Sequence, residues 1–332
     1  MAEPILVVDD VQVEFKTRAG VARVLDGVSF SIEKGRTLGI VGESGCGKSM
    51  TALSIMGLIP SPPGQVVGGS IRLNGENLFE AKERRMREIR GNEISMIFQE
   101  PLTSLNPVFS CGEQIAETIR LHEGLSRKDA NDKAVEMIRS VGIPNPRRRA
   151  KEYPHQMSGG MRQRLMIAMA LACSPSVLIA DEPTTALDVT VQAQIFDLLR
   201  ELQDSFNTAI IMITHDMGAI ADMADRVMVM YAGRVIEEGT VDAILDAPLH
   251  PYTQGLIDCV PHLEAETPAE RPPLMEIPGV VPPLTALGKG CAFAPRCAHV
   301  HARCRGEKPR SVEYAGDHRA SCFKLEAEEA AV

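Results

Sequence analysis

One short motif constrains the fold of this chain more than any other feature. Residues 42–49 read Gly-Glu-Ser-Gly-Cys-Gly-Lys-Ser and fit the pattern G-x-x-x-x-G-K-[ST]. An apolar run at 37–41 precedes them and predicts a buried strand, and residues 50–58 predict a helix. A glycine-rich loop between a strand and a helix turns its N–H groups towards phosphate oxygens, and the helix N-terminus adds positive potential. The motif therefore predicts an α/β fold with a nucleoside triphosphate site.

The residues of this loop have distinct expected roles. The glycines allow the tight curl of the backbone. Lys48 is placed to reach the β- and γ-phosphates, and the hydroxyl of Ser49 is placed to ligate Mg²⁺. The candidate nucleotide-binding residues of the loop are Gly42, Glu43, Ser44, Gly45, Cys46, Gly47, Lys48 and Ser49.

The composition limits the class of protein. The 332 residues suffice for a large core and two domains. The net charge of −9 argues against non-specific binding of nucleic acid, which depends on neutralising phosphates. No apolar run approaches the roughly 18 residues that span a bilayer, and the N-terminus does not read as a signal peptide. We expect a soluble, intracellular chain that reaches a membrane only through a partner, and whose eight cysteines are not a disulfide framework.

The order of predicted elements indicates the architecture. Strands are expected at 5–15, 24–32, 70–73, 94–98, 177–180, 209–213, 226–231 and 234–236. Because several of them alternate with helical patterns, we predict an α/β core with a largely parallel sheet. A mostly helical stretch at about 107–173 predicts an inserted subdomain. The change of composition after about residue 248 predicts a separate tail module.

Polar side chains follow three of the apolar runs. Asp181 and Glu182 end the run at 177–180, so they would lie at the carboxyl edge of the sheet beside the loop. We expect Asp181 to hold Mg²⁺ and Glu182 to act as general base on the attacking water. His215, after the run at 209–213, is a candidate for holding the γ-phosphate and the water, and Gln99 for reaching Mg²⁺ or the water.

A second phosphate cradle is predicted where Ser158-Gly159-Gly160 precedes a long apolar helix. One chain does not need two cradles for one nucleotide. The economical interpretation is a dimer in which this cradle closes on the ATP of the partner.

Together these motifs resemble the nucleotide-binding domain of an ABC transporter over roughly residues 4–250. The resemblance depends on the loop, Gln99, the run 157–161, the run 177–182, Ala186-Leu187-Asp188 and His215, in this order. It implies a sandwich dimer that holds ATP between the loop of one subunit and the signature of the other, and an aromatic residue stacked on adenine. Phe15 is the candidate for stacking; the alternative interpretation is that Phe15 is a core residue of its strand. The expected signature residues are Ser158, Gly159, Gly160, Met161 and Asp188.

The signature departs from the usual L-S-G-G-Q, because Met157 and Met161 flank its core triad. Since Ser158 and the glycines donate to phosphate, we expect the cradle to function. With Met161 in place of the usual Gln, the signature loses one polar contact.

The stretch 251–332 narrows the resemblance to one family of ABC transporter ATPases. His250-Pro251-Tyr252-Thr253 and the run 291–297, Cys-Ala-Phe-Ala-Pro-Arg-Cys, look like the C-terminal extension of oligopeptide and dipeptide importer ATPases. That family implies an ATPase working as an unlike pair on two membrane permeases, fed by an extracytoplasmic peptide-binding protein. The chain would then lie peripherally on the cytoplasmic face of the inner membrane. Alternatives are the same motor for nickel complexes or another small solute, and a soluble ABC ATPase acting on nucleic acid or ribosomes.

Four cysteines of the tail form a candidate metal site. Cys291, Cys297, Cys304 and Cys322 have five, six and seventeen residues between them, without the C-x-x-C pair of a zinc ribbon. Four thiolates can hold a [4Fe–4S] cluster, and the resemblance implies one here. A zinc site and free thiols are the alternatives. Nearby Arg296, Arg303 and Arg305 are expected to offset the charge of a cluster.

Overall fold

The structure is a computed structural model that describes residues 3–99, 104–184, 187–260 and 275–325. Its strands are β1 (Pro4–Thr17), β2 (Gly20–Glu33), β3 (Thr37–Val41), β4 (Gly64–Leu73), β5 (Glu76–Asn77), β6 (Ile94–Ile97), β7 (Val177–Asp181), β8 (Ala209–Ile213), β9 (Arg226–Tyr231), β10 (Arg234–Thr240), β11 (Val312–Ala315) and β12 (His318–Ala320). Its α-helices are α1 (Lys48–Ile55), α2 (Glu83–Ile89), α4 (Cys111–Glu123), α5 (Arg127–Ser140), α6 (Pro146–Arg149), α7 (Gly159–Ala170), α8 (Val189–Phe206), α9 (Met217–Met223), α10 (Val241–Asp246), α11 (Pro251–Asp258) and α12 (Ala302–Gly306). Short 3₁₀ turns cover Pro154–Gln156 and Leu284–Ala286.

A parallel sheet forms the centre of the molecule and confirms the predicted α/β core. Within the described residues its strand order is β11-β12-β10-β9-β3-β8-β7-β6, and the pairs from β9 to β6 are parallel. Every residue of β3, β7 and β8 is buried, because these short apolar runs are covered on both faces. The carboxyl ends of these five neighbouring strands, β9 to β6, therefore meet at one edge of the sheet.

A smaller antiparallel sheet, with strand order β2-β1-β4-β5, packs against the central one. Its apolar face shares one core cluster with residues of β3, β6, β7 and β8. The strand predicted at 70–73 is too short, because β4 begins at Gly64. Glycine-rich sequence hides the strand pattern there, yet β4 pairs with β1 from Leu73 opposite Leu6 to Gly64 opposite Phe15.

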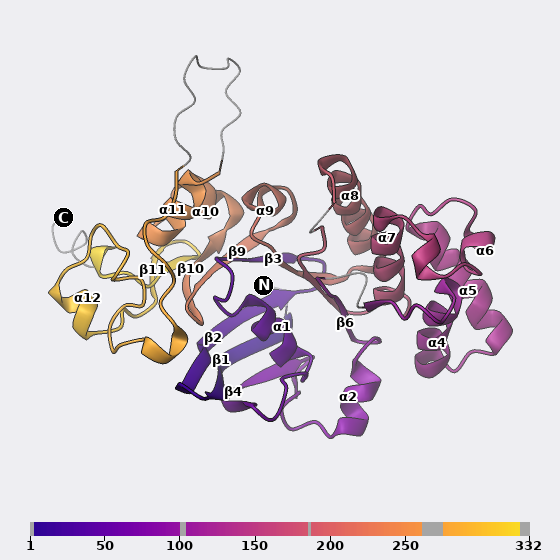
Figure 1. The fold of residues 1–332 in the computed structure, drawn as a ribbon, viewed down its shortest axis with the longest axis horizontal. Coiled ribbons are helices and arrows are strands. Elements are labelled where there is room, and N and C mark those ends of the chain that lie inside the picture. Colours follow the sequence, from indigo (N-terminus) through magenta and orange to yellow (C-terminus); the bar gives the residue numbers. More distant parts are fainter. Residues whose placement is uncertain (1–2, 100–103, 185–186, 261–274, 326–332) are drawn as a thin grey trace, which may run out of the picture.

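The helical subdomain lies at one end of the molecule and the C-terminal extension at the other (Figure 1). Ser110 and Ser126 cap the N-termini of α4 and α5, and Gly124 ends α4 in a left-handed conformation. The apolar sides of α4, α5 and α7 share a second core cluster with α8. None of the helices in the described ranges is long and apolar enough to cross a bilayer.

The C-terminal extension is joined to the nucleotide-binding core by main-chain pairing. Glu237 of β10 pairs with Ala320 of β12, so β12 and β11 continue the central sheet. A third core cluster, shared by β9, α9, α10 and α11, includes Phe293 of the extension. The limits of the two predicted domains, 4–250 and 251–332, stay predictions.

Candidate nucleotide-binding site

The glycine-rich loop connects β3 to α1, as its motif predicts. Gly42, Gly45 and Gly47 have φ angles of +149°, +77° and +109°, which side chains other than glycine rarely adopt. A Cβ atom at position 42 would lie 2.3 Å from the carbonyl oxygen of Met230. The curl that brings successive N–H groups to one side therefore depends on glycine at these positions.

The side chain of Lys48 is already held over the loop. Its ammonium donates to the carbonyl oxygens of Gly42, at 2.7 Å, and of Glu43, at 3.1 Å, and the residue is only 6% exposed. Cys46 is buried beneath it, and burial raises the pKa of its thiol. The loop is thus fixed around the buried ammonium group of Lys48.

Asp181 ends β7 beside the start of α1. Burial raises the pKa of its carboxyl group, while a hydrogen bond with Ser49 acts in the opposite direction. Its Oδ1 is buried without a hydrogen-bond partner among the described residues. A buried carboxylate oxygen without a donor, next to a serine hydroxyl, suits a hard cation such as Mg²⁺.

Glu182 lies between the two other predicted catalytic side chains. Its Oε2 accepts from Gln99 Nε2 at 2.7 Å, and its Oε1 is 3.2 Å from His215 Nδ1. The φ angle of Glu182 is +49°, a left-handed conformation that costs about 1–2 kcal/mol for a residue with a Cβ. Its amide donates to the carbonyl of Ile213 at 2.8 Å, so β8 fixes this turn. The carboxylate therefore links the ends of β6, β7 and β8.

The predicted signature residues begin a separate helix. Ser158 caps α7, and its hydroxyl accepts from the amide of Met161 at 3.3 Å. Ser158 and Gly159 are exposed, and Met157 is buried beneath them. Asp188 likewise caps α8 and accepts from the amide of Val191 at 2.9 Å. Ala186 lies outside the described residues. Figure 1 shows α7 among the helices of the helical subdomain, apart from α1.

Phe15 lies on β1 and packs, partly buried, against the core cluster between the sheets. A Cβ atom on Gly64 would lie 2.8 Å from its ring, so β4 crowds one side of it. This position leaves the stacking role of Phe15 a prediction.

The four predicted metal-ligating cysteines line one small cavity, together with His250 and Phe293. Burial first, and the neighbouring cysteines to a smaller extent, raise the pKa of the Cys322 thiol to about 11. Throughout the described ranges, no three His, Cys, Asp or Glu side chains are grouped so as to hold a metal ion. Arg296 is not directed at these thiols as expected, because its guanidinium binds Glu43.

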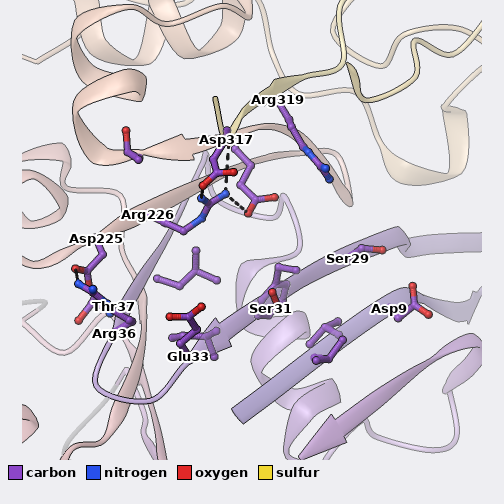
Figure 2. A pocket seen from close by; sticks show the side chains of 17 residues that line it. Asp9, Ser29, Ser31, Glu33, Arg36, Thr37, Asp225, Arg226, Asp317 and Arg319 are labelled. Carbon is purple, nitrogen blue, oxygen red and sulfur yellow. Dashed lines mark hydrogen bonds and ion pairs between the residues drawn. The ribbon is translucent and has the colours of Figure 1, made fainter. Parts of the chain in front are cut away.

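A second hollow, of about 740 Å³, lies at the opposite ends of the strands from the loop, between β2, the starts of β3 and β9, and the extension. Figure 2 shows that two of its arginines are paired with carboxylates that also line the hollow. Arg36 contacts Asp225 at 2.8 Å, and Arg226 contacts Glu238 at 3.0 Å and Asp317 at 3.2 Å. This hollow is not the predicted nucleotide site.

Two residues near the loop were not predicted as part of the site. The hydroxyl of Tyr252 accepts from the amide of Glu43 at 2.8 Å, and Arg296 forms a bidentate ion pair with the Glu43 carboxylate. The run His250-Pro251-Tyr252-Thr253 was the available signal. His250 caps α11 and so orients Tyr252.

Comparisons with known proteins agree with this geometry. Residues 25–185 match the ABC transporter family, and residues 236–304 match the oligopeptide/dipeptide transporter C-terminal region. A probable peptide ABC transporter ATP-binding protein, y4tR of Sinorhizobium fredii, is 51% identical, with 97% of this chain and 96% of the relative covered. The oligopeptide transport ATP-binding proteins OppD of Salmonella typhimurium and AppD of Bacillus subtilis are 50% and 49% identical; they cover 97% and 92% of this chain, and 94% and 92% of their own lengths are matched.

Solved structures show the same fold. The ATP-binding cassette MJ0796, in a dimer bound to ADP and phosphate, matches with a TM-score of 0.64 at 26% identity, covering 71% of this chain and 98% of its own. CbiO1 of Clostridium perfringens, part of an ABC transporter complex, matches with a TM-score of 0.62 at 26% identity, covering 74% and 92%. The chain therefore belongs to the ABC ATPases, in the family of oligopeptide and dipeptide transporter ATP-binding subunits.

Proposed function

We propose that this chain hydrolyses ATP to power the import of oligopeptides or dipeptides across the cytoplasmic membrane. The observation that carries this proposal is the extension, since residues 236–304 match a region described for oligopeptide and dipeptide transporters. Relatives that share about half of their residues with this chain are named peptide or oligopeptide transport proteins. The alternative of a soluble ABC ATPase lacks comparable support.

In the proposed site, the phosphates of ATP lie on the loop from Gly42 to Ser49. Ser49, Asp181 and Gln99 would hold Mg²⁺, which when bound neutralises charge on the phosphate oxygens. The unpartnered Oδ1 of Asp181 and its hydroxyl neighbour support this donor set. Phe15 is proposed to stack on adenine.

Glu182 is the proposed general base. It takes a proton from the water that attacks the γ-phosphorus, while His215 holds the water and the γ-phosphate. Support comes from the carboxylate of Glu182, whose side chain is only 16% exposed, lying between Gln99 and His215. Gln99 donates to this base and, as a proposed ligand of Mg²⁺, would report which nucleotide is bound.

The composite site is completed by a second, homologous ATPase subunit, which we propose to be an unlike chain. The signature residues of that partner would contact the nucleotide bound by this chain. In return, this chain would offer Ser158, Gly159, Gly160, Met161 and Asp188 to the nucleotide of its partner. The exposure of Ser158 and Gly159 at the start of α7 supports this role.

The remaining proposed partners are two membrane permeases and an extracytoplasmic peptide-binding protein. The chain would lie peripherally on the cytoplasmic face of the inner membrane and bind no nucleic acid. The movement that closes the dimer on ATP would be passed to the permeases through the surface beside Gln99. The proposed limits are 4–250 for the nucleotide-binding domain and 251–332 for the extension.

We further propose that Cys291, Cys297, Cys304 and Cys322 hold a structural [4Fe–4S] cluster, with zinc as the alternative. The four thiols line one cavity, yet among the described residues no three such side chains are grouped closely enough to hold a single metal ion. A cubane has widely separated corners and uses the same donors. Anaerobically purified protein should contain iron and acid-labile sulfide, which Cys297→Ser loses and the control Cys259→Ser retains. Zinc without iron would refute the cluster.

The central test is uptake of labelled di- to pentapeptides by cells lacking this chain. Restoration by the wild type, but not by Glu182→Gln, is expected. Glu201→Gln, on the exposed side of α8, is the matched control and should restore uptake. Normal uptake in the deletion strain would refute the peptide assignment, and the same strain would then be tested with nickel complexes.

A further inference from the structure

The C-terminal extension holds the phosphate loop from outside. Glu43 is the second residue of the motif, and its carboxylate accepts two hydrogen bonds from Arg296: Nη1 to Oε2 at 2.6 Å and Nη2 to Oε1 at 3.1 Å. Arg296 is separated from Glu43 by 253 positions and stands directly before Cys297. Its side chain is only 3% exposed, so this pair is shielded from solvent on the arginine side.

Further contacts fix the guanidinium itself. Its Nε donates to the carbonyl of Pro278 at 2.9 Å, and Nη2 also donates to the carbonyl of Ile277 at 3.0 Å. Its carbon lies 5.9 Å from the ring centres of both Tyr231 and Phe293. A guanidinium held on several sides loses little further entropy when it binds a carboxylate.

The backbone of Glu43 is held as well. Its amide donates to the hydroxyl of Tyr252, a fully buried residue. The amide of Tyr252 donates to His250 Nδ1 at 3.0 Å, and the amide of His250 donates to the buried Glu237 at 2.8 Å. A chain of hydrogen bonds therefore runs from β10 to the second residue of the loop.

These contacts bear on nucleotide binding for two reasons. First, the carbonyls of Gly42 and Glu43 are the acceptors that hold the ammonium of Lys48, so the segment that the extension fixes also positions that cation. Second, an unpaired carboxylate in a phosphate loop repels a polyanion, and the guanidinium cancels that charge.

We propose that Arg296 is a positioning residue for nucleotide binding: it neutralises Glu43 and, with Tyr252, holds the first turn of the loop ready for phosphate. The proposal rests on the proposed function of the loop. It gives the extension a direct role in the ATP site, apart from any metal site.

A double-mutant cycle tests this proposal in the full-length protein, with binding of a fluorescent methylanthraniloyl derivative of ATP as the readout. Arg296→Gln should weaken binding about five- to tenfold, because Glu43 then stays charged and unpaired. Glu43→Gln removes the carboxylate charge and should therefore weaken binding less than Arg296→Gln does. The double variant should match Glu43→Gln rather than Arg296→Gln, and Arg296→Lys should lie between wild type and Arg296→Gln.

A merely structural role makes different predictions. If Arg296 only anchors the extension, then Glu43→Gln weakens binding as much as Arg296→Gln does, and removing both charges restores nothing. Neutralisation also predicts that the loss is larger for the ATP derivative than for the ADP derivative and falls as salt increases. Equal loss for both nucleotides at all salt concentrations would overturn the proposal.

Three controls separate the possible failures. Arg319→Gln removes another arginine of the extension, paired with Glu313 at 3.1 Å, and should leave binding unchanged. Thermal melting identifies any variant that does not fold. Lys48→Ala tests the loop itself: if this variant binds as wild type does, the proposed nucleotide site is wrong. If Lys48→Ala fails to bind while Arg296→Gln binds normally, only the role of Arg296 is wrong.

Discussion

Replacement of Glu182 by glutamine should separate ATP binding from hydrolysis. The carboxylate accepts from Gln99 Nε2 at 2.7 Å and lies 3.2 Å from His215 Nδ1. An amide of the same shape keeps an oxygen for Gln99 and offers an N–H to the histidine nitrogen when that nitrogen is unprotonated. The left-handed backbone is unaffected, because both residues have the same Cβ. We expect the free energy of unfolding to change by less than about 0.5 kcal/mol.

The rate of hydrolysis should respond very differently. Loss of a positioned general base typically costs about 10²- to 10⁴-fold, which corresponds to about 2.7–5.5 kcal/mol in the barrier. The dissociation constant for ATP should stay within about twofold of wild type or decrease, since a negative charge near the γ-phosphate is removed.

The assay measures phosphate release by the transporter in proteoliposomes and, separately, equilibrium binding of nucleotide. Glu201→Gln is the matched control, since it makes the same chemical change at an exposed position of α8. Turnover of Glu182→Gln within about threefold of the control would refute Glu182 as the base. Loss of ATP binding together with turnover would show instead that the substitution disrupts the site.

Three further outcomes are expected. Lys48→Ala should weaken ATP binding at least about tenfold in equilibrium titration, since the phosphates lose a buried ammonium, and unchanged affinity would refute the loop as the site. Gly42→Ala should destabilise the protein by about 2–4 kcal/mol in urea unfolding, because its Cβ would lie 2.3 Å from the Met230 carbonyl oxygen at a φ of +149°. Burial lowers the pKa of His250 from 6.5 to about 3. Between about pH 6.5 and pH 3 the unfolded chain therefore binds one more proton at this residue than the folded chain does. Stability should therefore fall by roughly 2 kcal/mol from this group between pH 7 and pH 5, and His250→Asn, which can still cap α11, should show a smaller fall; equal falls would refute the assignment.

The arrangement of the candidate site could be predicted from sequence because its parts obey a local rule. Each polar residue directly follows a short apolar run, and parallel strands bring their carboxyl ends to one edge whatever the length of chain between them. Gln99 and Glu182 are 83 positions apart and still form a hydrogen bond. The left-handed conformation of Glu182 could not be predicted from the local sequence, because it goes with a hydrogen bond from its amide to Ile213 of β8.

The role of the extension could not be predicted in the same way. Its strands β11 and β12 have only four and three residues and become strands by pairing with each other and with β10. Arg296 lies between two cysteines, which suggested that its charge serves a metal site. Nothing in the local pattern indicates a carboxylate 253 positions earlier.

The residue proposed to bind the phosphates and the residue proposed to hold the attacking water differ in how deeply they are buried. Lys48 is 6% exposed and fixed by loop carbonyls, and the loop is fixed in turn by buried groups of the extension. The side chain of His215, in contrast, is 67% exposed and lies 3.2 Å from Glu182 Oε1. In the proposed site, a preformed cradle would take up phosphate before the rest of the site is shielded, whereas His215, the proposed water-holding group, would still need a cover. In the proposed dimer the partner signature supplies that cover, so hydrolysis would wait for closure although binding would not.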